Sequence, residues 1–544
     1  MEPVTIGVTK EYLEGASVND CEDYGGLGAH FLDTLYEHIN KIHQIDTVTG
    51  ATETNGSVRT RSIQIAHELR HFGVGENDIV IICCRGHADQ TVVVLACLLI
   101  GSIVAPIDPE LQHKECVELI RQLRPKIFFC DLRTLKQMER VCAESEITAI
   151  MVHFGEQQQY AIPFRKLLMT RHYPEQFKPV SVDQPRKKVA FIMATQGTNG
   201  SPKLVCLSHH FIFCQVKVFL NVMELPEKII SYYPLSWVMQ VVLMCLCFKA
   251  HVVRVLPGAF VERTACKLIH DLKVDHAFLN TDLALQLVEH VAVRDFNLSS
   301  LRCVFIGSLT TTSHDIKRLS HRLPKVKFTQ MYCTTEVGIV VATPPEDYPE
   351  SLERIGTVGK VVQNCKIRIV DIEKRKDLDV ESSGELLVAS DCMMLGYFKN
   401  IALTKASTQE GYFKTGDIAR YDSGGWIFIE GTISDLINVE GTNESPREIE
   451  EIILQHPYVK DTAVISDEKE VVACVIVKTD AKLDEDKLTK FMSDRNLLRK
   501  PARILFMSDF PTTPLGKIRR DLLKQDVLTI KIERSTDHLS TTSC

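Results

Sequence analysis

An alternation of short β-rich runs with longer amphipathic stretches, extending from about residue 59 to residue 330, constrains the fold most strongly. Ile79–Cys84 is followed by the helical stretch His87–Ile100, and Lys126–Cys130 is followed by Leu135–Ala143. Parallel strands need crossover connections, which are usually helices, so this alternation predicts layered α/β structure with much parallel sheet.

The pattern changes twice along the rest of the chain. Beyond Gly356, three closely spaced strands (Lys366–Asp371, Gly384–Ala389 and Gly425–Glu430) predict a small β-barrel-like subdomain. The last hundred residues read as a compact α+β unit. We therefore predict an α/β protein with a large N-terminal domain of layered α/β subdomains, residues 1–432, and a small α+β C-terminal domain, residues 433–544.

Ser445 and Pro446 predict the start of a helix within this small domain. A serine at the N-cap and a proline in the first turn are typical of helix N-termini, which places the helix at Ser445–Gln455. Two strands, Thr462–Ser466 and Glu470–Lys478, and a second helix, Asp484–Asp494, follow.

Composition excludes several classes of protein. The chain has 544 residues, 45% of them hydrophobic, which excludes wholesale disorder, and its net charge of −7 gives no support to nucleic-acid binding. The longest apolar run, Thr91–Ala105, is shorter than the ~20 residues that a membrane span needs, so we predict a buried helix there and no transmembrane segment.

The 18 cysteines include no CxxC pair, and several lie in apolar runs, which is typical of reduced, buried thiols. The N-terminus lacks a basic region followed by an apolar region, so we expect an intracellular protein. The C-terminus lacks a Ser-Lys-Leu-type signal, which leaves cytosol and peroxisome open.

A Gly/Thr-rich segment, residues 194–203, is the first candidate site. It follows the apolar strand Val189–Met193, and a second strand, Lys203–Leu207, follows it directly. Glycines allow backbone N–H groups to approach a polyphosphate, and Lys203 adds a positive charge. The spacing is not that of a Walker A loop, and taken alone such a turn is more often a plain loop.

Four further segments carry polar or charged groups that could contact a nucleotide or its metal ion. Residues 332–338 place a hydroxyl beside a carboxylate, which suits phosphate and Mg²⁺ but also a capped turn. Residues 411–417 end in an aspartate that could accept ribose hydroxyls or simply stabilise a turn. Residues 431–441 lie at the predicted domain joint, and residues 511–520 present one lysine on a Pro/Gly-rich loop, where the plain alternative is a solvated side chain.

In this order and spacing the five segments resemble the adenylate-forming (AMP-binding) superfamily, which includes acyl-CoA synthetases, coumarate–CoA ligases, insect luciferases and the adenylation domains of peptide synthetases. The resemblance extends from about Asp46 to Gln525 and is nearest to the coumarate–CoA-ligase-like and luciferase-like branch. It implies the substrates ATP, CoA and a fatty or aryl carboxylic acid, together with Mg²⁺. Oligomeric state does not follow from it.

The resemblance also implies a role for each matching residue. The phosphates would be held by Thr195, Gly197, Thr198, Gly200 and Lys203, and Thr335 would also contact phosphate. Glu336 would bind Mg²⁺, and Lys517 would bridge the carboxylate and the α-phosphate. Of the remaining residues, Tyr332 would pack on adenine, Asp417 would bind ribose, and Thr432 would face the nucleotide. Trp237, Ile306, Gly307 and Met331 would line the acyl pocket, and Ser434 and Gly441 would belong to the hinge for the CoA step.

The chain departs from the family pattern at several of these segments. Thr432 stands where an arginine is usual, Gly431 where an aspartate is usual, and Ser434 where a hinge lysine or aspartate is usual; Gln196, Asn199, Leu204, Trp237, Cys333, Asn438 and Glu440 also differ. The predicted function is an AMP-forming acid–thiol ligase. The alternatives are a catalytically weakened protein of the same fold that binds nucleotide or acyl ligand, and a bioluminescent oxygenase.

Overall fold

The computed structural model describes most of the chain. The described residues are 7–8, 13–15, 25–155, 161–169, 176–195, 202–307, 311–354, 356–439, 442–467, 470–479, 481–495, 501–512 and 518–529. Gly197, Thr198, Gly200, Gly441 and Lys517 therefore lie outside the described residues.

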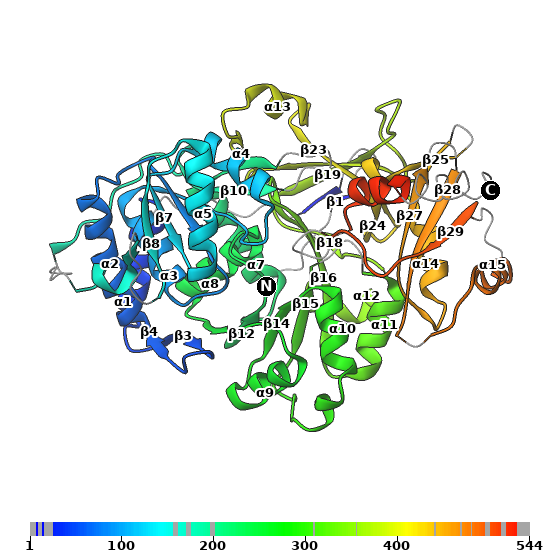
Figure 1. The fold of residues 1–544 in the computed structure, drawn as a ribbon, viewed down its shortest axis with the longest axis horizontal. Helices are drawn as coiled ribbons and strands as arrows, with labels where there is room; N and C mark the ends of the chain where they lie inside the picture. Colours follow the sequence, from blue (N-terminus) through cyan, green and yellow to red (C-terminus); the bar gives the residue numbers. More distant parts are fainter. Residues whose placement is uncertain are drawn as a thin grey trace, which may run out of the picture.

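An eight-stranded sheet forms the first layer of the large domain (Figure 1). Its order is β21 (Gly396–Tyr397), β11 (Lys203–Ser208), β10 (Val189–Thr195), β6 (Ile103–Pro106), β5 (Ile79–Cys83), β7 (Ile127–Cys130), β8 (Ile150–His153) and β9 (Ile162–Pro163). The strands from β10 to β9 are parallel, whereas β11 and β21 are added antiparallel. The predicted parallel sheet is confirmed.

A nine-stranded sheet forms the second layer. Its order is β18 (Lys360–Val361), β17 (Gly338–Ala342), β16 (Lys327–Thr334), β15 (Cys303–Ile306), β14 (His276–Leu279), β12 (Lys228–Ser231), β13 (Val253–Leu256), β3 (Ile42–Asp46) and β4 (Thr52–Thr54). The six strands from β16 to β3 are parallel, and β17 continues β16 as an antiparallel hairpin.

The main hydrophobic core fills the space between these two sheets. It contains α1 (Leu27–Glu37), α2 (Asn55–His71), α3 (Asp89–Ile100), α7 (His209–Val222) and α8 (Val238–Ala250). Helices α3 and α8 are apolar on nearly every side because they are buried on nearly every side. The apolar run 91–105 is a buried helix as far as Ile100, as predicted, but residues 103–105 belong to strand β6, which was not predicted. Among the described residues no helix is long and apolar enough to cross a membrane.

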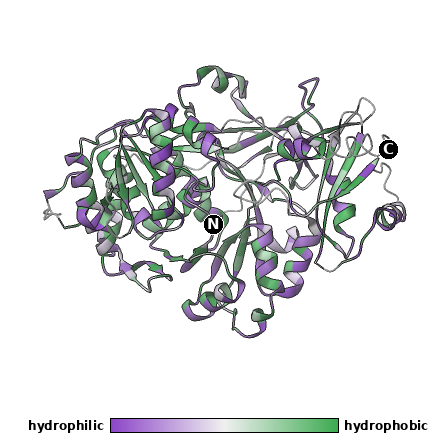
Figure 2. Ribbon diagram, in the orientation of Figure 1, coloured by the Kyte–Doolittle hydropathy of each residue, from purple (hydrophilic) through white to green (hydrophobic). Residues whose placement is uncertain are grey.

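Amphipathic helices cover the outer faces of the two sheets. Helices α4 (His113–Leu123) and α5 (Leu132–Ser145) pack on the eight-stranded sheet, and α9 (Glu262–Leu272), α10 (Thr281–Glu289) and α11 (Ser313–Arg322) pack on the nine-stranded sheet. Figure 2 shows their hydrophilic faces turned outward and the hydrophobic strands beneath them. Short elements are α6 (Phe164–Leu167), η2 (Val291–Arg294), α12 (Tyr348–Ser351), α13 (Ile401–Ala406) and η3 (Ile433–Asp435).

The closely spaced strands beyond residue 356 form a third, antiparallel sheet. Its order is β1 (Gly7–Val8), β2 (Leu13–Glu14), β19 (Cys365–Val370), β20 (Gly384–Ser390), β23 (Tyr412–Tyr421) and β22 (Thr408–Gln409), with β24 (Ile427–Thr432) also paired to β23. Strands β23 and β24 carry two of the predicted nucleotide-binding residues, Asp417 and Thr432.

A small α+β domain lies at the end of the molecule away from α2 and α3 (Figure 1). It comprises β25 (Ile437–Val439), β26 (Thr442–Glu444), α14 (Arg447–Leu454), β27 (Val459–Asp467), β28 (Glu470–Val477), α15 (Glu485–Ser493) and β29 (Arg503–Phe506). The prediction of Ser445 as N-cap is wrong by one residue. Pro446 occupies the N-cap position of helix α14. The Ser445 hydroxyl accepts from the Arg447 amide at 3.3 Å and donates to the carbonyl of Glu430 at 2.9 Å, which joins this segment to β24.

Candidate active site

A buried hydrogen bond joins Tyr332 on β16 to Asp417 on β23. The Tyr332 hydroxyl donates to Oδ2 of Asp417 at 2.5 Å, and the two residues are only 4% and 8% exposed. The Asp417 amide donates to the Thr415 hydroxyl at 3.0 Å, which holds the strand at this point. Burial and the neighbouring carboxylate raise the pKa of Tyr332 well above its usual value, so the tyrosine remains a neutral donor.

Thr432 lies directly across from Asp417 on the antiparallel neighbour β24. The two residues are Cα partners, so their side chains share one face of the sheet. The Thr432 hydroxyl is 2.9 Å from the Ser434 hydroxyl. Gly431 has φ +145, a conformation that side chains rarely adopt, which explains why glycine suits this position. The structure therefore brings Asp417, Thr432 and Ser434 together.

A second cluster contains Glu336, Tyr397 and Lys203, of which Tyr397 is buried and the other two are partly buried. The Tyr397 hydroxyl donates to Oε1 of Glu336 at 2.8 Å, and Nζ of Lys203 lies 5.6 Å from the centre of the Tyr397 ring. Burial raises the pKa of Glu336, while the Tyr397 hydrogen bond and the charge of Lys203 oppose that rise. A partly buried carboxylate with a fixed outer partner is a suitable oxygen ligand for Mg²⁺.

The Gly/Thr-rich loop starts and ends at paired residues. Thr195 and Lys203 are Cα partners at the end of the β10–β11 hairpin where the two strands are connected, and helix α7 follows β11 with Ser208 as its N-cap. The two predicted strands that flank residues 196–201 are confirmed, and the second of them begins at Lys203, which belongs to the Glu336 cluster. Thr335 precedes Glu336 in the turn between β16 and β17, where the Thr334 hydroxyl accepts from the amide of Val337 at 3.3 Å.

The structure brings Trp237 and Gly307 together and adds Tyr233 to them. The rings of Tyr233 and Trp237 are 3.9 Å apart at their centres, and the Tyr233 hydroxyl donates to the Gly307 carbonyl at 2.9 Å. A side chain at position 307 would meet both aromatic residues at 3.2 Å. Met331 packs against the same core, whereas Ile306 packs on the opposite face of its sheet with Val304 and Leu279 and does not join this group.

Polar contacts connect the small domain to the large one. A guanidinium nitrogen of Arg447 donates to the Thr311 carbonyl at 3.1 Å, and Arg519 lies 3.4 Å from the Glu115 carboxylate. A cavity of about 110 Å³, whose lining includes Thr432 and Ile518, lies between the domains. It is smaller than the ~300 Å³ at which ligand pockets begin, so it is a space at the domain interface rather than a nucleotide pocket.

Sequence reasoning assigned no role to Tyr397, Tyr233 or Arg447. The signal for Tyr397 was available in part, because Gly396 and Tyr397 form a short motif with Thr404, whose hydroxyl accepts from the Tyr397 amide at 2.9 Å. No sequence signal indicates that Tyr233 contacts Gly307 or that Arg447 contacts Thr311, since these pairs lie 74 and 136 positions apart.

A large layered α/β domain, a small α+β domain and polar clusters on strand ends define an adenylate-forming class of protein. The AMP-binding enzyme family model matches residues 33–398, and the AMP-binding enzyme C-terminal domain matches residues 448–517. The chain therefore belongs to the AMP-binding enzyme family.

Similar proteins include oxygenases as well as ligases. A luciferin 4-monooxygenase of Photuris pensylvanica is 27% identical over 485 residues, which cover 85% of this chain and 88% of that protein. A 4-coumarate–CoA ligase of Petroselinum crispum is 26% identical over 507 residues, which cover 90% and 92%. The solved structure of the luciferase-like enzyme of the nonluminescent mealworm Zophobas morio has a TM-score of 0.74 at 25% identity and covers 78% of this chain and 99% of that chain.

Proposed function

We propose that this protein is an ATP-dependent acyl-CoA ligase that activates a fatty or aryl carboxylic acid. The substrate carboxylate attacks the α-phosphorus of ATP and pyrophosphate leaves, which gives an acyl-adenylate. The CoA thiol, losing its proton, then attacks the acyl carbonyl and AMP leaves. The observation that best supports this proposal is the buried Asp417–Tyr332 pair opposite Thr432, in a chain of the AMP-binding enzyme family.

Each residue contributes to holding charge or orienting groups. Asp417 accepts hydrogen bonds from the ribose hydroxyls. The Tyr332 hydroxyl donates to the Asp417 carboxylate and orients it, while the Tyr332 ring keeps its expected place beside adenine. Thr195, Gly197, Thr198, Gly200, Lys203 and Thr335 hold the phosphates. Glu336 would hold Mg²⁺, which supplies Lewis-acid neutralisation of phosphate charge when bound. Lys517 stabilises the negative charge that develops as carboxylate and phosphate approach.

The domain boundary and the hinge belong to the same proposal. We place the boundary between residues 432 and 433, where β24 ends, and Ser434 and Gly441 in the segment that reorients the small domain between the two half-reactions. Ile518, the residue after Lys517, lines the interdomain cavity. A movement of the small domain would therefore change the surroundings of Ile518.

The acid is proposed to bind beside Trp237, Gly307 and Met331. The absence of a side chain at Gly307 leaves bare backbone against the Trp237 and Tyr233 rings, which offers an apolar wall to an acyl or aryl group. We place the reaction inside the cell, in cytosol or peroxisome, where thiols stay reduced; the cysteines in the described ranges are free thiols.

The decisive experiment measures pyrophosphate release from ATP and Mg²⁺ across a panel of fatty and aromatic acids, with and without CoA. A ligase releases pyrophosphate with a preferred acid and forms the corresponding thioester when CoA is added. Pyrophosphate release without thioester contradicts the CoA half-reaction, and light emission with luciferin would favour the oxygenase. Nucleotide binding without pyrophosphate release from any acid favours the catalytically weakened alternative.

The weakened alternative is supported by Thr432, because an arginine is expected there and a threonine cannot make a charge-assisted bond. In Thr432→Arg the new guanidinium would lie on the same face as Asp417, but the hydrogen bond to Ser434 would be lost. We expect a net gain of about 1–2 kcal/mol, or roughly 5–30-fold, in ATP affinity by calorimetry.

The rate of the same variant distinguishes the two functions. A working ligase should gain in kcat/KM for adenylation, whereas a degenerate binder should gain affinity without pyrophosphate release. Thr432→Val, which matches the size of threonine without its hydroxyl, is the control and should show no gain. Unchanged affinity and rate in Thr432→Arg would mean that position 432 does not face the nucleotide.

The raised pKa of Glu336 makes a pH-dependent Mg²⁺ requirement expected. Only the ionised carboxylate binds the cation, so lowering the pH through this raised pKa protonates Glu336 and increases the Mg²⁺ concentration needed for half-maximal rate. Glu336→Gln should raise that concentration by about tenfold or more at neutral pH and flatten its pH dependence. Tyr397→Phe, which keeps the carboxylate, should retain the pH dependence; an unchanged Mg²⁺ requirement in Glu336→Gln would remove the metal role.

A further inference from the structure

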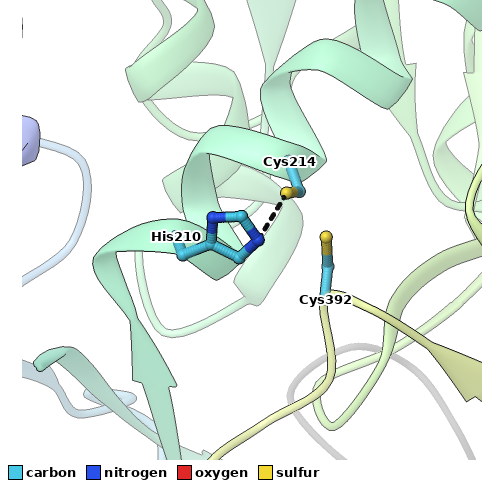
Figure 3. Close-up of side chains that lie close together, drawn as sticks. All are labelled: His210, Cys214 and Cys392. Carbon is cyan, nitrogen blue, oxygen red and sulfur yellow. Dashed lines mark hydrogen bonds between the residues drawn. The ribbon is translucent and has the colours of Figure 1, made fainter. Parts of the chain in front are cut away.

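Three soft ligand groups meet in the interior of the large domain, apart from the residues assigned above. His210 and Cys214 lie four positions apart on α7, and Cys392 lies in the segment between β20 and β21 (Figure 3). One ring nitrogen and the two sulfur atoms all lie within 4.8 Å of one another, and all three residues are buried. Residues four apart on a helix share a face, so α7 presents two ligands together to the third.

The spacing of these atoms fits a tetrahedral metal centre. Nε2 of His210 is 3.3 Å from Sγ of Cys214. Bond lengths of ~2.0–2.1 Å to histidine nitrogen and ~2.3 Å to cysteine sulfur place two such ligands about 3.6 Å apart around tetrahedral zinc. The existing separation therefore needs only a small adjustment, and Cys392 lies within reach as the third ligand.

We propose that His210, Cys214 and Cys392 bind one zinc ion. Binding would replace the two thiol protons, which leave to solvent, by two zinc–sulfur bonds, and the neutral imidazole would supply the third ligand. Two thiolates and one Zn²⁺ have no net charge, which suits a buried position where an uncompensated charge is costly. Monovalent copper with the same ligands would leave a net negative charge. A water molecule would complete the coordination of Zn²⁺.

The ion would attach α7 to the segment that reaches Glu336. Within that segment, the Met394 amide donates to the Glu336 carbonyl at 2.7 Å, and the Leu395 amide donates to the Cys206 carbonyl at 2.8 Å. Tyr397, whose hydroxyl donates to the Glu336 carboxylate, follows two residues later. A bond at Cys392 would therefore fix the segment at a further point, in addition to these backbone contacts, so the site would stabilise the fold without contacting substrate.

A second group of ligand atoms provides a useful comparison. Glu37, His38 and His251 also lie within 4.8 Å of one another, but two of them are exposed and none offers sulfur. Such a surface group can take up excess metal weakly, so metal content by itself does not identify the buried site. Cobalt does, because Co²⁺ in zinc sites absorbs in the near ultraviolet through charge transfer from thiolate, and oxygen and nitrogen ligands lack that band.

The test uses the full-length, reduced protein, stripped of metal by a chelator and then titrated with Zn²⁺ or Co²⁺. The variants are Cys214→Ala, Cys392→Ala and the milder His210→Asn, with circular dichroism to verify folding. Cys365→Ala is the matched control, because Cys365 is equally buried but outside the cluster. A double His38→Gln/His251→Gln variant removes the surface group.

We expect the wild type, Cys365→Ala and the double histidine variant each to bind one equivalent of Zn²⁺ and to show a thiolate–cobalt band. Their unfolding temperatures should rise with Zn²⁺. Cys214→Ala and Cys392→Ala should lose the cobalt band and bind Zn²⁺ at least about 100-fold more weakly, since even outer-shell losses cost about 10–100-fold. His210→Asn should weaken binding while keeping a thiolate–cobalt band. Three results would overturn the proposal. The first is loss of metal uptake in the double histidine variant, and the second is the absence of a cobalt band in the reduced wild type. The third is a Cys214–Cys392 disulfide as the only product at this position.

Discussion

Replacing Lys517 by alanine is expected to slow adenylation by about 10²–10³ in kcat while leaving the Michaelis constants nearly unchanged. The expected size follows from the loss of one charged group that acts mainly on the transition state, where carboxylate and phosphate charges approach each other. Pyrophosphate release with the preferred acid measures the rate, and calorimetric ATP titration measures binding, which should stay close to wild type.

Lys524→Ala is the matched control for this prediction. Lys524 lies seven residues further along, in the helical stretch 520–529, and carries the same charge without a role in the proposed chemistry. Its loss should leave the rate unchanged. Equal rates for wild type and Lys517→Ala would contradict the assignment of Lys517 and place the reacting groups elsewhere in the molecule.

Asp417→Asn is expected to weaken ATP binding by about 1.5–3 kcal/mol, or roughly 10–150-fold. This is the range for hydrogen bonds to a charged group, and the variant removes the charge of the acceptor proposed for two ribose hydroxyls. Asparagine has the same shape, and its carbonyl oxygen can still accept from the Tyr332 hydroxyl, so the β16–β23 contact should survive. Calorimetric titration with ATP measures the loss.

Tyr332→Phe separates the two partners of that contact. It removes the hydroxyl that orients Asp417 but keeps the carboxylate and the aromatic ring, so its effect on ATP affinity should be smaller than that of Asp417→Asn. ATP affinity at the wild-type level in Asp417→Asn would exclude the ribose role. A larger effect in Tyr332→Phe than in Asp417→Asn would indicate that the tyrosine contributes more than orientation.

The layered architecture was predictable because it depends on local pattern. Short apolar runs such as Ile79–Cys83 cannot span a helical core and must pair in a sheet, and the all-apolar Thr91–Ile100 stretch must be buried on every side. The antiparallel end of the first sheet, where β11 reverses and β21 joins from almost 190 residues away, was not predictable, since strand pairing at that distance leaves no periodic signal.

The sequence predicted which motifs contain the candidate site residues, but it did not predict which of these residues contact each other. Thr335 and Glu336 were expected together because they are neighbours in sequence, and the facing of Thr195 and Lys203 follows from the hairpin that they close. The distance between Tyr332 and Asp417 follows from no motif. Ile306 shows the opposite error. Adjacent strand residues point to opposite faces, and because every residue of β15 is buried, only the packing partners of Ile306 show which face its side chain takes.

The sequence by itself determined the fold class, the family and the kinds of chemical group available, because hydrophobic periodicity and motif spacing are properties of neighbouring residues. Tertiary structure alone decided that Asp417 meets Tyr332 and Thr432, that Tyr397 reaches Glu336, and that Cys392 lies beside His210 and Cys214. These contacts join residues between 15 and 182 positions apart. Only the packing of two sheets and their connecting segments around one buried core brings such groups within bonding distance.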